Sequence, residues 1–128
     1  VVSPSKDDCY SRMTLTVSGD GESLEQIIHQ LNKLVDVIHA TDHTGDVVVE
    51  RELALIKVEC AAEKRTEILQ ISDHFKCDTV DISPDTLMLQ STGSTEKLDA
   101  LFEMVRPYGI REMVRTGKVL MIRGSSET

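Results

Sequence analysis

Aromatic residues, basic charge and long hydrophobic runs are all scarce in this chain of 128 residues. It has no Trp, two Tyr and two Phe, and its 22 acidic residues outnumber its 14 Lys and Arg, which gives a formal net charge of −8. So few rings provide no platform for stacking bases, and the negative charge repels phosphates, which excludes nucleic acid as a partner. No apolar run approaches the ~20 residues that cross a bilayer, and no signal segment opens the chain, so no membrane association is expected.

Cysteine is also scarce. Cys9, Cys60 and Cys77 are odd in number, widely spaced and form no CxxC pair, which indicates reduced thiols and a cytoplasmic location. Cys60 and Cys77 flank a predicted helix, and we expect them to pack as small hydrophobes. An initial Met is missing as well, since the chain opens with Val1-Val2 as though entered partway along.

The composition, 40% hydrophobic and 28% charged, is that of a globular protein. In the first part of the chain, alternation over residues 12–18 predicts a strand with Met13, Leu15 and Val17 on one face. Ser23 and Gln26 have the spacing of a capping box, which predicts a helix start. The helix of about three turns that follows carries an apolar stripe, and β-branched residues 35–40 predict a second strand before a connection over residues 41–45. The stripe consists of Leu24, Ile27, Ile28, Leu31 and Leu34.

The second part of the chain predicts a fuller set of elements. Residues 47–60 form a long strand, a helix covers residues 63–76, and strands near residues 80–82 and 87–92 meet at a tight turn over residues 83–86. A further helix ends before Pro107, and strands follow at residues 110–114 and 119–122. The inward residues are predicted to be Ala54, Ile56, Val58 and Cys60 on the long strand, Ile68, Ile71 and Phe75 on the first helix, and Leu98, Leu101, Phe102 and Val105 on the second.

The two parts repeat at an offset of 74 positions, which matches the two helix stripes, Met13 with Leu87, and Gly19 with Gly93. The complete second module reads β-α-β-β-α-β, the ferredoxin-like α+β arrangement, in which both helices cover one face of a four-stranded antiparallel sheet. By the same offset, the opening strand and helix of the first module fall before residue 1. We therefore predict a partial first module over residues 1–44, a second over residues 45–123 and a flexible tail over residues 124–128.

An open sheet face follows from helices on one side only. Leu53 and Leu55 lie on it beside Lys57 and Glu59, and Met88 lies on it in the neighbouring strand. It is either ordinary exposed apolar area or a face that packs against a partner, and we favour a second copy of the chain. The predicted partner interface consists of Arg51, Glu52, Leu53, Leu55 and Met88. Arg51 and Glu52 lie where the modules join, so charge reversal there is predicted to weaken association.

No group of residues has the pattern of a catalytic, cofactor or metal site. His39 and His43 fall on a strand end and a loop, where a spacing of four has no helical meaning, and His29 and His74 lie elsewhere. Gly19-Asp20-Gly21 lacks the spacing of a phosphate loop and is interpreted as a strand-to-helix turn. The paired acids Asp7-Asp8 and Glu50/Glu52 have no apolar pocket around them and are interpreted as solvated charge. An enzyme is therefore the weakest functional hypothesis.

Several stretches of the chain are similar to the small regulatory subunit of acetolactate synthase (acetohydroxyacid synthase). The most specific are QLNKLVDV at residues 30–37 and VERELALIKV at residues 49–58, and weaker ones cover residues 11–15, 24–27, 93–100 and 109–117. The resemblance runs in order over most of residues 1–123.

The resemblance implies an N-terminal ACT domain followed by a second ferredoxin-like domain, in a homodimer that binds and activates the catalytic subunit. It also implies feedback inhibition by a branched-chain amino acid, usually valine. Thiamine diphosphate, Mg²⁺ and FAD would belong to the catalytic subunit. The family's effector residues fall before Val1, so none is assigned here. A stand-alone amino-acid-sensing module of a transcriptional regulator is the alternative.

Overall fold

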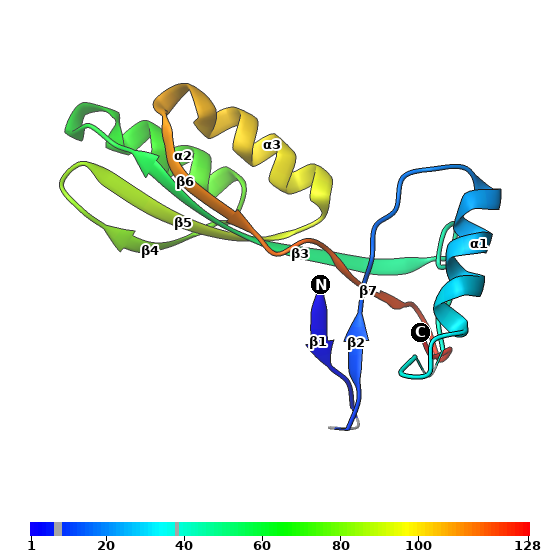
Figure 1. Ribbon diagram of the computed structural model, residues 1–128. Helices are drawn as coiled ribbons and strands as arrows, with labels where there is room; N and C mark the ends of the chain where they lie inside the picture. The colour runs from blue at the N-terminus through cyan, green and yellow to red at the C-terminus, as the bar shows by residue number, and fades with distance from the viewer. Residues whose placement is uncertain (7–8, 38) are drawn as a thin grey trace. The chain divides into compact units, whose positions relative to one another are not determined.

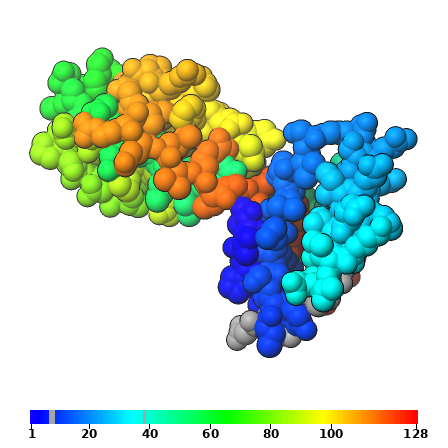
Figure 2. Space-filling model, in the orientation of Figure 1, coloured from blue at the N-terminus to red at the C-terminus, as the bar shows by residue number. Residues whose placement is uncertain are grey.

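Two compact units make up the computed structural model, which describes residues 1–6, 9–37 and 39–128. The first unit consists of Glu50–Val119 with Val1, and the second of Val2–Val49 with Leu120–Thr128. The space-filling view shows the first unit, coloured green to orange, as one compact body (Figure 2). The module limits predicted at residues 44 and 123 stay predictions. No helix in the described part of the chain is long and apolar enough to cross a membrane.

The first unit has the predicted ferredoxin-like order of elements (Figure 1). Strand β3 (Val48–Glu59) leads into the 3-10 helix η1 (Ala62–Lys64) and helix α2 (Arg65–His74), and then into strands β4 (Asp78–Ile82) and β5 (Thr86–Gly93). Helix α3 (Thr95–Val105), the 3-10 helix η2 (Arg106–Tyr108) and strand β6 (Ile110–Arg115) complete it. The sheet order is β4-β5-β3-β6 and the paired strands are antiparallel, which confirms the predicted topology.

The core of the first unit lies between this sheet and its two helices, which Figure 1 shows on one side of the strands. Burial alternates along β3, where Ala54, Ile56 and Val58 are buried while the residues between them are half-buried. This confirms the predicted inward face. Each large side chain buried here contributes roughly 1.5–3 kcal/mol of transfer free energy. The largest are Ile56, Ile68, Leu87, Leu89, Leu98 and Leu101.

The turn between β4 and β5 confirms the prediction made from Ser83-Pro84-Asp85-Thr86. The Ser83 amide donates to the Thr86 carbonyl at 2.9 Å. Arg65, at the start of α2, donates from Nη2 to the carbonyls of Ser83 and Pro84 at 2.8 and 3.2 Å. The turn is therefore anchored to the helix as well as closed within itself.

The second unit contains strands β1 (Val2–Pro4) and β2 (Ser11–Met13), which pair antiparallel, and helix α1 (Gly21–Asn32). Strand β7 (Val119–Ile122) pairs with β3. The strand predicted over residues 12–18 is shorter than expected, because its ladder with β1 ends where Met13 faces Val2. Met13, Leu15 and Val17, which were predicted to share one face of this strand, are exposed.

Helix α1 begins three residues earlier than the capping-box prediction placed it. Asp20 is the N-cap, and its Oδ1 accepts the Ser23 amide at 2.8 Å, so the prediction that Ser23 caps the helix was wrong. Aspartate caps a helix as well as serine does, and Asp20 comes first along the chain. The prediction that Gly19-Asp20-Gly21 forms a strand-to-helix turn is confirmed.

The strand predicted over residues 35–40 was also wrong for the residues that the structure describes; Ile38 lies outside them. Turns continue the end of α1, with the Val37 amide donating to the Leu34 carbonyl at 3.1 Å. The Asn32 side chain then accepts the Ala40 amide at 2.8 Å and donates to its carbonyl at 3.4 Å. These local bonds use backbone groups that a strand would need for pairing, and they outweigh the β-branched composition.

The repeat at 74 positions is visible in the start of two helices. Gly19 and Gly93 have φ angles of 155° and 157°, and the N-caps Asp20 and Ser94 follow them. Each cap accepts the amide three residues on, from Ser23 at 2.8 Å and from Lys97 at 3.2 Å. The two segments therefore share a local structure as well as a sequence pattern.

Candidate interaction surfaces

The open face of the sheet in the first unit brings together three of the predicted interface residues. Because burial alternates along β3, Leu53 and Leu55 lie opposite the helix-covered face, as does Met88 on β5. Leu55 stands between Gln90 on β5 and Val114 on β6, and Val114 is 59% exposed. The neighbouring row holds Met88, Lys57 and Glu112, in which Lys57 Nζ lies 3.3 Å from Glu112 Oε2. We call this surface, made of Leu53, Leu55, Met88 and Val114, the open sheet face.

Glu52 does not belong to the open sheet face. Its side chain, 7% exposed, lies on the covered side of β3, where it accepts a hydrogen bond from Arg115 Nε. Arg115 Nη1 also donates to Asp99 Oδ1 on α3 at 2.6 Å. These hydrogen bonds, to Asp99 and then to Glu52, raise the pKa of Arg115. Glu52 is thus an internal ion-pair residue and not the solvated charge expected from the sequence, while its part in a partner interface stays a prediction.

Arg51 is exposed, and its Nη1 donates to the Glu50 carbonyl at 2.7 Å. The sequence did not distinguish Arg115 from the other scattered arginines, although one signal was available. Glu52 has the same parity along the strand as Ala54 and Ile56, so the alternation itself places it on the buried face and requires a cationic partner there.

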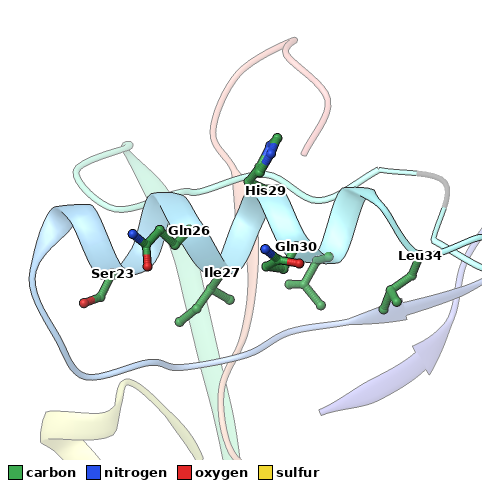
Figure 3. Close-up of a pocket in the computed structure, with 7 residues that line it drawn as sticks. Ser23, Gln26, Ile27, His29, Gln30 and Leu34 are labelled. Carbon is green, nitrogen blue, oxygen red and sulfur yellow. The ribbon is translucent and has the colours of Figure 1, made fainter.

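A second surface is the apolar side of α1 in the second unit, where a groove of about 560 Å³ is lined by residues of the predicted stripe. In Figure 3, Ile27 and Leu34 point to the same side of the helix. Ser23, Gln26, His29 and Gln30 supply polar groups along its length. No residue of α1 is fully buried, whereas Leu98, Leu101 and Val105 of the corresponding helix α3 all are. The groove can therefore receive apolar side chains.

The four histidines lie at different places along the chain. His43 Nδ1 lies 3.0 Å from Asp46 Oδ2 in the connection, and His74 at the end of α2 meets the Phe75 ring edge-on with centroids 5.0 Å apart. His29 is on α1, and His39 precedes the connection. Among the described residues, no group of three or more histidine, cysteine or acidic side chains is placed to hold a metal ion.

Cys60 and Cys77 are free thiols. Cys60 is buried in the core, Cys77 packs against it and Cys9 is exposed. Burial raises the pKa of the Cys77 thiol, so it stays protonated at neutral pH. A protonated thiol is a poor nucleophile, and Cys60 and Cys77 act here as small packing residues.

Comparison with known proteins gives the same family along both units. Residues 51–124 match the family model described as the small subunit of acetolactate synthase, and residues 1–39 match the ACT domain of acetohydroxyacid synthase small subunits. These matches are independent of the surfaces described above.

Individual relatives agree with the family models. The probable acetolactate synthase small subunit of Archaeoglobus fulgidus is 43% identical over 126 residues, which are 98% of this chain and 79% of the relative. The acetolactate synthase small subunit of Bacillus subtilis is 46% identical over 118 residues, covering 91% and 69%. The crystal structure of the small subunit from Thermotoga maritima superposes with a TM-score of 0.88 at 35% identity, covering 98% of this chain and 78% of that one. None of these relatives supports the alternative of a transcriptional effector module.

Proposed function

The chain belongs to the family of acetolactate synthase small subunits, and on that premise we propose that it activates a catalytic subunit and makes it sensitive to a branched-chain amino acid. The observation that supports this most is the match over nearly the whole chain, through both the ACT segment and the second module. Valine is the expected effector, with leucine and isoleucine as the other candidates.

Catalysis, in this proposal, takes place in the partner chain. That chain would hold thiamine diphosphate, Mg²⁺ and FAD, and the present one would act only through binding, in the cytoplasm. An effector changes the activity of a partner only if it binds more tightly to one of two states of the complex. The amino acid must therefore favour a state in which the catalytic subunit is less active.

We further propose that the chain forms a homodimer and that the open sheet face contributes to it. Leu53, Leu55 and Met88 form an apolar centre, and the Lys57–Glu112 pair at its margin offers both charges to a symmetry-related copy. An isologous contact requires such a self-complementary surface.

The test is to add the full-length protein to purified acetolactate synthase catalytic subunit and to measure turnover with and without valine, leucine and isoleucine. We expect turnover to rise on addition and one of the amino acids to reverse the rise. If neither turnover nor amino-acid sensitivity changes, the chain is not the regulatory subunit of that enzyme.

A further inference from the structure

A groove on the outer side of the first unit's helices is separate from both surfaces described above. It has a volume of about 330 Å³ and runs between α2 and α3. Its main lining residues are Glu67, Ile71 and His74 on α2, Phe75 at the end of that helix, Met104 on α3 and Tyr108 on η2. The groove lies on the opposite side of the sheet from Leu53, Leu55 and Met88.

The floor of the groove is apolar and partly built on the core. Ile71, Phe75 and Tyr108 are half-buried and pack against the core cluster, which holds them in place. Met104 is 51% exposed although it is a large hydrophobic residue. Methionine is flexible and polarizable, so an exposed one beside a fixed aromatic floor adapts to the shape of an incoming apolar side chain.

The charge at the groove comes from Glu67. Its Oε2 accepts a hydrogen bond from the Tyr108 hydroxyl at 2.8 Å, and this bond raises the pKa of Tyr108, so the phenol stays neutral. Lys64 Nζ lies 3.8 Å from Glu67 Oε1, but both side chains are about half exposed, and such a pair contributes little. The carboxylate is therefore oriented by Tyr108 while its charge is only weakly compensated.

These features together favour a protein segment as the occupant. Small ligands bind where 70–90% of their surface is buried, whereas every residue lining this groove is half-buried or exposed. Tyrosine, phenylalanine and methionine are enriched at protein interfaces, and a carboxylate at the margin favours a cationic neighbour.

We propose that the groove between α2 and α3 binds a segment of the catalytic subunit in which an aliphatic side chain lies beside a lysine or arginine. The aliphatic side chain contacts Phe75 and Met104, and the cation pairs with Glu67. This inference rests on the proposed function, because it takes the catalytic subunit as the partner, and it adds the surface and the chemistry of the contact.

The test measures the affinity of the full-length protein for the catalytic subunit. Two groove variants, Met104→Glu and Glu67→Lys, are compared with matched controls, Ala100→Glu on α3 and Glu63→Lys just before α2, which are exposed and do not line the groove. We expect the groove variants to raise the dissociation constant roughly tenfold or more, and the controls to stay within about twofold. Glu67→Gln should reduce the salt dependence of binding. Thermal melts followed by circular dichroism establish that each variant is folded.

The other outcomes separate the two proposals. If the groove variants bind as tightly as the unmodified protein, or if groove and control variants lose affinity equally, the groove is not the contact and the proposed function stands. If the unmodified protein neither binds nor alters the catalytic subunit, the proposed function fails, and the groove proposal fails with it.

Discussion

Glu52 is a buried acidic residue in a charged stretch of the sequence. It lies among charged neighbours, yet its side chain is 7% exposed and meets Arg115, which also holds Asp99 at 2.6 Å. The three residues join β3, β6 and α3 across the covered side of the sheet. Removing one member of such a group leaves an incompletely paired charge in a partly buried place, which is costly.

We therefore predict that Glu52→Ala lowers the free energy of unfolding by about 1.5–3 kcal/mol, as expected for the loss of a charged hydrogen bond with partial burial. Urea denaturation followed by circular dichroism measures this. The control is Glu103→Ala, which removes an ion pair with Arg106 whose side chains are 66% and 68% exposed. That change should cost less than about 1 kcal/mol. If the two variants lose the same free energy of unfolding, the Glu52–Arg115 pair stabilises the protein no more than an exposed ion pair does.

Charge reversal at Glu52 now has a different expected effect from charge reversal at Arg51. Glu52→Lys would place a cation beside Arg115 and destabilise the unit itself, so it does not test association. Arg51 is exposed and donates to the Glu50 carbonyl, so Arg51→Glu remains a usable test of a partner surface.

At the scale of elements, α1 and α3 begin with the same geometry but with chemically different caps. The Asp20 carboxylate accepts the Ser23 amide, and this bond lowers the pKa of Asp20 below its ordinary value of 3.8. A lowered pKa in the folded state gives stabilisation that is complete above the ordinary value and is lost as the pH falls through the lowered one. Ser94, the cap of α3, does not titrate in this range.

The first turn of α1 should consequently fray on acidification, while the first turn of α3 should change less. Cα chemical shifts of both helices, followed from about pH 6 to pH 2, measure this. Asp20→Asn keeps a good cap without a titrating group and should remove the Asp20 step from the pH profile of α1. A profile that is the same in the variant and in the unmodified protein would mean that the cap does not govern this end of the helix.

The elements could be predicted where hydrophobic periodicity determines the structure, but not where a specific side-chain bond determines it. The alternation along β3 and the stripe of α3 predicted both elements, and the inward faces were correct except for Phe102, which is half-buried, because burial follows the hydrophobic periodicity. The predicted strand at residues 35–40 failed because the Asn32 side chain captures the Ala40 backbone. The spacing of hydrophobic residues in the sequence gives no sign of such a bond.

The same reasoning explains which surface residues could be placed correctly from the sequence. Leu53, Leu55 and Met88 were placed on one face from alternation alone, and the structure agrees on that face. The contacts of Arg115 with Asp99 and of Tyr108 with Glu67 join residues 16 and 41 positions apart. A single sequence gives no register for such contacts, because they depend on how the helices pack on the sheet.

For the whole molecule, the open sheet face yields a prediction about self-association. Half-buried Leu55 lies at its centre, and an exposed Val114 adjoins it, so a second copy would cover apolar area that water now contacts. We predict that Leu55→Asp raises the dimer dissociation constant roughly tenfold or more, since it places a charge in the middle of the contact. Sedimentation equilibrium over a range of protein concentrations measures the constant.

The matched control is Val80→Asp, which puts the same charge at a 46%-exposed position on strand β4 of the same sheet. It should leave the dissociation constant within about twofold of the unmodified value, because a charge outside a contact changes its affinity little. Far-UV circular dichroism of both variants separates loss of association from loss of folding. If the folded Leu55 variant associates like the control, the copies meet through another surface, and the open sheet face is then free to contact a different partner.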